Sequence, residues 1–196
     1  MAQNKINKYN IVAIGGSAGS FDVLMKIVAE LPEKTHASFI IVVHRKNSPD
    51  TILAQLLSIK TTLPVKEVED KDVLKPGCIY IASPDYHLLI EDKHQFSLDS
   101  SEKINYSRPS IDVTFECVAE VFRSAAIGVL LSGANADGAV GLQKIKEYGG
   151  YTIAQDPSSA DVGYMPQQAI DTGNVDAILH ADEIAAFIKK LLLTPV

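Results

Sequence analysis

The sequence is poor in cysteine and in the spacings that bind metal ions. Among 196 residues it has two cysteines, Cys78 and Cys117, which lie far apart in apolar contexts. Neither has a second cysteine or a histidine at zinc-ligand spacing, so a structural metal site is not expected. Separate apolar thiols are typical of buried residues in a reducing compartment and not of a disulfide framework.

Long apolar runs and strong positive charge are also lacking. The first ten residues are polar, which excludes a signal peptide, and no apolar run reaches membrane-spanning length. The net charge of −6 argues against a nucleic-acid partner. There is no internal repeat. We therefore expect one cytoplasmic domain over residues 1–196, with no metal, no cofactor, no nucleic acid and no membrane insertion.

What the sequence does have is a glycine-rich turn near its start. Residues 11–14 are an apolar, β-branched run that predicts a buried strand, and apolar residues at helical spacing follow residue 20. Between them, Gly15-Gly16-Ser17-Ala18-Gly19 fits G-x-S-x-G, the strand–turn–helix pattern that presents a serine nucleophile. Ser17 is then expected at a helix N-terminus, where unpaired N–H groups can hold an oxyanion.

Two other interpretations of this turn fit less well. A dinucleotide-binding turn requires G-x-G-x-x-G, whereas the glycines here fall at positions 15, 16 and 19. A phosphate-binding P-loop requires Gly-Lys-Ser/Thr, which is absent from the stretch.

Strands and helices alternate over most of the chain. This pattern predicts an α/β fold, doubly wound, with a mostly parallel sheet flanked by helices and an antiparallel hairpin excursion in the middle. The hairpin is expected at residues 86–90 and 95–98, and residues 107–110 are expected to be an exposed polar linker. Asp50 and Asp182 are expected near the starts of two helices, Asp182 as a cap. Further strands are predicted at residues 38–43, 65–68, 78–82, 126–131, 151–154 and 175–179, and further helices at 111–122, 139–148 and 164–172.

Three strand ends carry residues of catalytic type. Ser17 follows the first strand, His44 the second, and Asp137 lies in the loop after residues 126–131. Because ligands bind outside the carboxyl ends of parallel strands, we expect a nucleophile, a base and an orienting acid to meet there. A histidine can also be a polar residue at the sheet rim, and an aspartate before glycine a turn or cap residue. Asp161 and Asp112 are rival acids, Asp112 more in keeping with a cap on its own helix. The remaining histidines fall in predicted loop, hairpin or surface segments: His36, His87, His94 and His180.

Six blocks in order carry a resemblance that spans about residues 9–193. They are Ile14-Gly15-Gly16-Ser17-Ala18-Gly19, Val43-His44, Arg108-Pro109-Ser110-Ile111-Asp112-Val113, Leu131-Ser132-Gly133-Ala134-Asn135-Ala136-Asp137-Gly138-Ala139, Ala154-Gln155-Asp156 and Met165-Pro166-Gln167-Gln168-Ala169-Ile170. In these blocks the chain resembles the catalytic domain of the chemotaxis receptor methylesterase family, the CheB type.

The resemblance implies hydrolysis of glutamyl methyl esters on the cytoplasmic helices of chemoreceptors, and deamidation of certain receptor glutamines. It implies Ser17 as nucleophile, His44 as general base and acid, and Asp137 as the residue that orients His44. The backbone N–H groups of Ala18 and Ala134 match the family's oxyanion-hole positions.

Some residues depart from the family pattern. Ser20 stands where a second glycine is usual, and Arg45 where a hydrophobic residue is common. Ala134 and Ala136 replace a methionine and an asparagine of the acid loop. The sequence starts at the catalytic strand without the receiver domain that many members carry. We therefore expect a stand-alone domain, with a receiver protein or a methyltransferase as a partner in trans.

Several alternatives stay open at this point. Arg45, Arg108 and Met165 are candidates for substrate binding, although solvated surface charge is the favoured interpretation of both arginines. A related esterase or amidase could use the same triad on another substrate. A non-catalytic scaffold that docks on receptors could share the fold, but it would not need to retain Ser17, His44 and Asp137 together.

Overall fold

Seven parallel strands form the central sheet of the computed structural model, which describes residues 9–45, 52–91 and 95–193. Their order across the sheet is β3-β4-β2-β1-β7-β8-β9, and every neighbouring pair is parallel. The strands are β1 (Ile11–Gly16), β2 (Ser38–Val43), β3 (Val65–Glu67), β4 (Ile79–Ile81), β7 (Ala126–Leu130), β8 (Tyr151–Gln155) and β9 (Ala177–Leu179). The predicted doubly wound α/β fold is confirmed.

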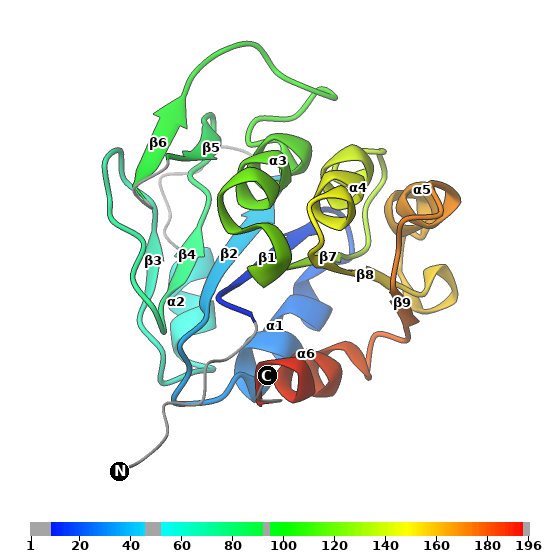
Figure 1. Ribbon diagram of the computed structural model, residues 1–196, viewed down its shortest axis with the longest axis horizontal. Helices are drawn as coiled ribbons and strands as arrows, with labels where there is room; N and C mark the ends of the chain where they lie inside the picture. The colour runs from blue at the N-terminus through cyan, green and yellow to red at the C-terminus, as the bar shows by residue number, and fades with distance from the viewer. Residues whose placement is uncertain (1–8, 46–51, 92–94, 194–196) are drawn as a thin grey trace.

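Helices cover both faces of this sheet (Figure 1). One face packs against α1, α2 and α6, and the other against α3, α4 and α5. No helix in the described ranges is long and apolar enough to cross a membrane. The elements are α1 (Phe21–Glu30), α2 (Ile52–Ser58), α3 (Ile111–Phe122), α4 (Ala139–Glu147), α5 (Tyr164–Asp171) and α6 (Ile184–Leu193), with short 3₁₀ turns η1 (Arg123–Ala125) and η2 (Pro157–Ser159).

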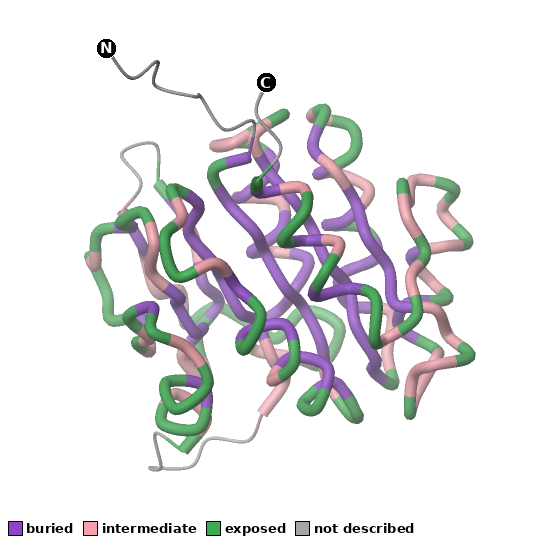
Figure 2. Tube along the Cα trace, turned by 90° about the horizontal axis from the view of Figure 1, so that it is seen from below, coloured by how far each residue is buried: buried purple, intermediate pink, exposed green. Residues whose placement is uncertain are grey.

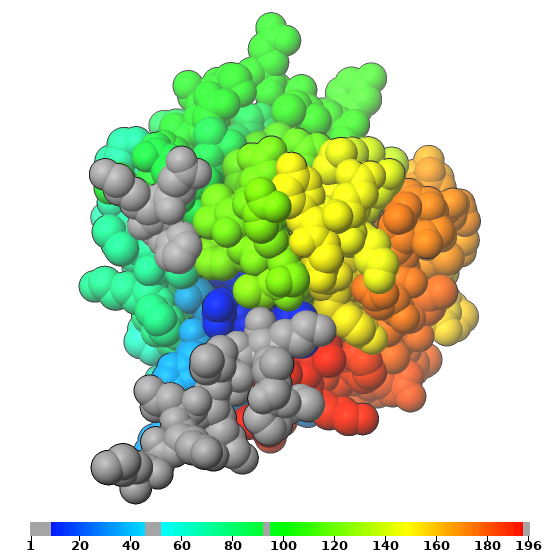
Figure 3. Space-filling view, viewed as in Figure 1, coloured from blue at the N-terminus to red at the C-terminus, as the bar shows by residue number. Residues whose placement is uncertain are grey.

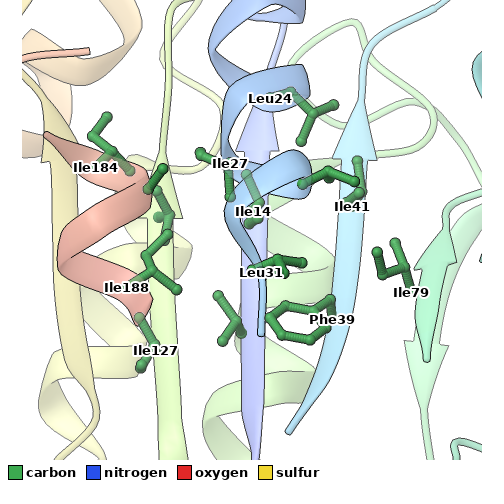
Figure 4. Close-up of a cluster of buried hydrophobic side chains, with 14 of the residues drawn as sticks. Ile14, Leu24, Ile27, Leu31, Phe39, Ile41, Ile79, Ile127, Ile184 and Ile188 are labelled. Carbon is green, nitrogen blue, oxygen red and sulfur yellow. The ribbon is translucent and has the colours of Figure 1, made fainter. Parts of the chain in front are cut away.

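The central strands are apolar on both faces, which is why they read as continuous hydrophobic runs. Along β1, Val12 and Ile14 pack towards α1 and α6, while Ile11 and Ala13 pack towards α3 and α4. Successive side chains of a strand point to opposite faces, so one short run supplies both cores. Figure 2 shows the buried strands running through the middle of the molecule, and Figure 4 shows the core on the α1 and α6 side, with Ile14 at its centre.

The order of the strands creates a switch point at β1. From β1 the chain moves to β2 on one side, and later returns to β7 on the other side. Ligand sites of open α/β sheets lie outside the carboxyl ends of strands at such a point. The three strands predicted to carry Ser17, His44 and Asp137 are the ones that meet here.

The antiparallel excursion is also confirmed. Strands β5 (His87–Ile90) and β6 (Phe96–Asp99) pair with each other in a separate two-stranded sheet. The predicted turn between them includes residues 92–94, which lie outside the described residues, as does the predicted helix start at Asp50.

Two local predictions are wrong. The 107–110 segment is not an exposed linker, because Pro109 and Ser110 are buried and Ser107 and Arg108 are half-buried. The sequence predicted Asp182 as the cap of the last helix. Helix α6 begins at Ile184, and Asp182 does not cap it. The Asp182 carboxylate accepts a hydrogen bond from Lys26 Nζ at 2.6 Å, which ties the start of α6 to α1.

Removing a buried aromatic ring should test how much the α1-side core contributes to stability. Phe39 of β2 is 0% exposed, whereas Phe21 of α1 is 43% exposed. We expect Phe39→Ala to lower the free energy of unfolding by about 3–5 kcal/mol, because lost burial and a cavity add together. The same change at Phe21 should cost about 1 kcal/mol or less. Urea unfolding of both variants measures this, and equal losses would contradict the assigned core.

Candidate functional site

Two of the predicted site residues form a close pair. His44 directly follows β2, and Asp137 lies in the loop between β7 and α4. His44 Nε2 lies 2.7 Å from Asp137 Oδ2, with the histidine side chain 13% exposed and the aspartate side chain fully buried. The structure therefore brings together a histidine that solvent can reach and a carboxylate that it cannot.

The Asp137 carboxylate is held by donors from the start of α3. Ser110 Oγ donates to Oδ1 at 2.8 Å, and the backbone N–H groups of Ile111 and Asp112 donate at 2.7 and 3.1 Å. Burial by itself raises the pKa of Asp137, but the hydrogen bonds from His44 and from these groups outweigh it and hold the pKa below its ordinary value. Asp137 is therefore ionised at neutral pH.

The ionised Asp137 fixes the tautomer of His44. A carboxylate only accepts hydrogen bonds, so Nε2 of His44 carries the proton and Nδ1 keeps its lone pair. Nδ1 lies 3.3 Å from Ser107 Oγ, which can donate to it. Nδ1 is thus the nitrogen of His44 that can accept a proton from a substrate or a nucleophile.

Ser17 lies at the neighbouring strand end. Val43 pairs with Gly16 in the parallel register of β1 and β2, and His44 N donates to Gly16 O at 3.2 Å. Ser17 and His44 are therefore the next residues along two adjacent strands. The Ser17 backbone N–H donates to Ser132 O at 2.9 Å, which fixes the turn against the end of β7. Within the described ranges Ser17 Oγ has no hydrogen-bond partner, and its residue is half-buried.

The backbone N–H groups of the two predicted oxyanion donors make no hydrogen bond to a described residue. Ala18 and Ala134 are both exposed, and neither N–H has an acceptor within the part of the chain that the structure describes. Gly19 follows Ala18 with φ +76°, a conformation that side chains rarely adopt. A Cβ at Gly19 would also lie 2.4 Å from Asp161 Cβ. The turn therefore requires glycine there and leaves the Ala18 N–H uncovered.

The sequence predicted that Asp112 caps its own helix, and this prediction is wrong. Ser110 is the N-cap of α3, and its Oγ accepts from Val113 N at 3.4 Å. Asp112 Oδ1 instead accepts from the backbone N–H groups of Gly138 and Gly141, at 2.8 and 2.7 Å. The carboxylate thus joins α3 to the start of α4. Burial raises the pKa of Asp112 to about 6, and the nearby charge of Asp137 also raises it against those two N–H bonds.

The segment before α3 supplies contacts that the sequence did not indicate. Residues 104–107 form a tight turn in which Ile104 and Ser107 exchange backbone hydrogen bonds at 3.2 and 2.9 Å. Asn105 Nδ2 lies 3.0 Å from Asp112 Oδ2 and 3.5 Å from Asp137 Oδ1. No motif marks this asparagine, because the two carboxylates that it bridges lie 7 and 32 residues further along the chain.

A buried histidine supports the same segment. His87 was expected in a loop, hairpin or surface segment, and it does lie in the hairpin, but it is 1% exposed. His87 Nδ1 accepts from Ser110 N at 3.2 Å, and Nε2 lies 2.9 Å from Glu102 O. The His87 side chain therefore ties the hairpin strand β5 to both ends of the segment that precedes α3.

The remaining candidates lie in different surroundings. Arg45 and Arg108 face a hollow beside His44. Met165 is fully buried, and its side chain packs directly against Gly133, in the space that a Cβ there would need. Met165 therefore supports the loop that carries Asp137 and does not face a substrate. Asp161 is exposed next to Gly19 and is not the acid that contacts His44. No group of three metal-ligating side chains occurs within residues 9–45, 52–91 and 95–193.

A histidine held by a buried carboxylate, beside a serine on a strand–turn–helix, is the arrangement of serine hydrolases. The family model described as CheB methylesterase matches residues 12–188. The chain therefore belongs to the CheB methylesterase family and is a hydrolase of that family.

Individual relatives agree with this assignment. The chain is 42% identical over 183 residues to a putative protein-glutamate methylesterase/protein-glutamine glutaminase of Leptospira interrogans, covering 93% of this chain and 95% of that protein. It is 39% identical to the corresponding Thermotoga maritima enzyme over 93% of this chain, but over 54% of that protein. The crystal structure of the Thermotoga maritima CheB methylesterase catalytic domain matches with a TM-score of 0.89 and 38% identity, over 93% of this chain and 98% of that one.

The raised pKa of Asp112 predicts a pH-dependent effect of neutralising it. Because the folded-state pKa of about 6 lies above the ordinary aspartate value of 3.8, ionisation of Asp112 costs stability as pH rises between these values. Asp112→Asn removes that cost and keeps an oxygen for the Gly138 and Gly141 N–H groups. We therefore expect the variant to gain up to about 3 kcal/mol relative to wild type between pH 4 and pH 7.

Urea unfolding of both proteins across this pH range measures the difference. Taking the difference between the two proteins largely removes the opposite effect of Asp137, whose lowered pKa makes its stabilisation disappear as pH falls. If the difference in unfolding free energy between the two proteins stays constant with pH, the raised pKa of Asp112 is wrong.

Proposed function

We propose that this protein hydrolyses the methyl esters of glutamyl side chains on chemoreceptor cytoplasmic helices, with Ser17, His44 and Asp137 as its catalytic triad. Deamidation of receptor glutamines by the same residues is part of the proposal. The observation that carries it is the 2.7 Å contact between His44 and Asp137, which leaves Nδ1 as a base at the strand end next to Ser17. The names of the relatives support the choice of substrate.

In the acylation step, Ser17 Oγ attacks the ester carbonyl carbon while its proton passes to His44 Nδ1. The Nε2–H···Asp137 hydrogen bond stabilises the imidazolium that forms. The N–H groups of Ala18 and Ala134 donate to the developing oxyanion. The tetrahedral intermediate expels the methoxy group, which takes the proton from Nδ1 and leaves as methanol.

In the deacylation step, a water molecule gives a proton to His44 Nδ1 and attacks the acyl-enzyme. The second tetrahedral intermediate collapses to the free glutamate, and Ser17 Oγ recovers its proton from Nδ1. With a glutamine substrate, ammonia leaves in place of methanol. The esters that the enzyme consumes must come from a methyl-transferring enzyme, so we include a methyltransferase partner in trans, a regulating receiver protein in trans, and a cytoplasmic location in the proposal.

Ser107 is a second candidate for the nucleophile, because its hydroxyl contacts His44. Its hydroxyl lies 3.3 Å from His44 Nδ1, whereas Ser17 Oγ has no partner within the described ranges. Ser17 is favoured because the uncovered N–H of Ala18 is next to it. Ser107 Oγ already accepts from Asn135 Nδ2 at 3.3 Å. In our proposal, Ser107 holds the imidazole in the resting enzyme.

Replacing each serine by alanine separates these two roles. We expect Ser17→Ala to lower methanol release from a methylated chemoreceptor fragment by roughly 1,000-fold or more, since a triad without its nucleophile keeps little activity. Ser107→Ala should lower it by no more than about tenfold, because the hydrogen bonds that it removes are neutral ones. Ser58→Ala, on the exposed end of α2, is the matched control and should leave the rate unchanged.

The opposite pattern, with Ser107→Ala inactive and Ser17→Ala active, would make Ser107 the nucleophile. If the folded wild-type protein releases no methanol but hydrolyses other esters, the triad stands and the receptor substrate is wrong. If neither kind of ester is hydrolysed, the non-catalytic scaffold alternative replaces the proposal.

A further inference from the structure

We propose that the hollow beside His44 is a carboxylate subsite, which binds an acidic side chain one helical turn away from the ester on the substrate helix. This inference rests on the proposed function and adds a specificity that the family assignment does not give. The hollow has a volume of about 380 Å³, which is ample for a side chain. Its lining includes His44, Arg45, Lys103, Arg108, Tyr106 and Asp85.

The lining carries excess positive charge although the protein is acidic overall. Arg45 donates to Glu67 Oε2 at 2.5 Å, so its charge is largely neutralised. Arg108 Nη1 donates to the carbonyl oxygens of Ser100 and Ser101, both at 2.6 Å, and the Asp99 carboxylate, which interacts with the charge of Arg108, lies outside the lining. Lys103 has no acidic partner within the described ranges, and Asp85 is the carboxylate in the lining. A negative group is therefore attracted to this hollow.

Arg108 has the geometry to bind that group. Its Nε is buried and lacks a hydrogen-bond partner in the described part of the chain. With Nη1 occupied by the two carbonyls and Nε closed off from solvent, Nη2 is the nitrogen of Arg108 for which no contact with a described residue is seen, and it is the donor left for a ligand in the hollow. A hydrogen bond from a guanidinium to a carboxylate is charge-assisted and stronger than a neutral one.

The position of the hollow determines where the acidic residue lies on the substrate. His44 is part of the lining, so the subsite borders the reacting ester. Side chains three or four residues apart on a helix are neighbours on its surface. A helix that presents its ester to Ser17 therefore brings a side chain from the next turn to Arg108 and Lys103.

Tyr106 provides a contact at the rim of the same hollow. It is 98% exposed, and Asn105 and Tyr106 have φ values of +50° and +62° in the tight turn. The backbone bonds between Ile104 and Ser107 fix that turn. The connection from β6 to α3, which includes Tyr106, projects from the top of the molecule in Figures 1 and 3. An exposed aromatic ring on a fixed turn is suited to packing against a partner helix.

Paired substrates test the subsite. Two helical peptides would each carry one glutamyl methyl ester, with either Glu or Gln one turn away, and methanol release would give kcat/KM. We expect the wild-type enzyme to favour the Glu peptide by about tenfold, as hydrogen bonds to charged groups are stronger than neutral ones. Arg108→Gln and Lys103→Gln should each reduce this preference, measured as the ratio of kcat/KM for the two peptides. Lys103→Glu should favour a peptide with Lys at that position.

Controls separate this inference from the proposed function. Arg123→Gln removes an arginine that follows α3 at the opposite end of the sheet, and it should keep the full preference. Lys103 is exposed, so its variants remain informative if Arg108→Gln perturbs the loop that it holds. Equal methanol release from both peptides by the wild-type enzyme would overturn the subsite and leave the methylesterase function standing. Release from neither peptide would overturn both.

Discussion

The buried carboxylate of Asp137 is the interaction on which the site depends. A carboxylate with no exposed surface remains charged only where fixed donors replace its water, and the start of α3 supplies these through Ser110 and the N–H groups of Ile111 and Asp112. These are groups that a helix N-terminus leaves without intrahelical partners. The same carboxylate then fixes the proton of His44 on Nε2. The basicity of His44, which follows β2, therefore depends on the position of α3. This dependence runs through Asp137, which belongs to a different βα unit from His44.

Asp112 shows what this arrangement costs. The carboxyl group of Asp112 joins α3 to the start of α4 through the N–H groups of Gly138 and Gly141, and this contact places it beside Asp137. Burial raises the pKa of Asp112 and the negative charge of Asp137 raises it further, whereas Asp137 has more donors and stays ionised. Asn105 reduces the repulsion by presenting its amide to both. The turn that contains Asn105 also places Ser107 against His44, so the support of the acid and the resting position of the base have a common origin.

The sequence predicts the fold well because the relevant signals are local. Short apolar runs such as residues 38–43 and 126–130 favour buried strands over helices, and the alternation with helices implies a parallel sheet. Ser17, His44 and Asp137 could be proposed together because parallel strands end at one edge. The roles of Asn105, Asp112 and Ser107 could not, since each depends on partners from other elements. The polar composition of residues 107–110 indicated solvent, whereas their polar groups are buried against Asp137, His44 and His87.

The same contrast explains how specificity can arise beside the proposed triad. The residues that we propose to perform the chemistry follow strand ends, where the hydrogen bonds of the sheet fix the backbone. The residues that face the hollow come largely from the connection between β6 and α3, which is attached to the site by side-chain contacts of Ser107 and Asn105. Substitutions at the exposed Lys103 and Tyr106 of that connection can change charge and shape at the hollow without removing a contact to His44 or Asp137. The proposed preference for acidic neighbours is therefore a property that this segment can gain or lose while the sheet and the proposed triad stay constant.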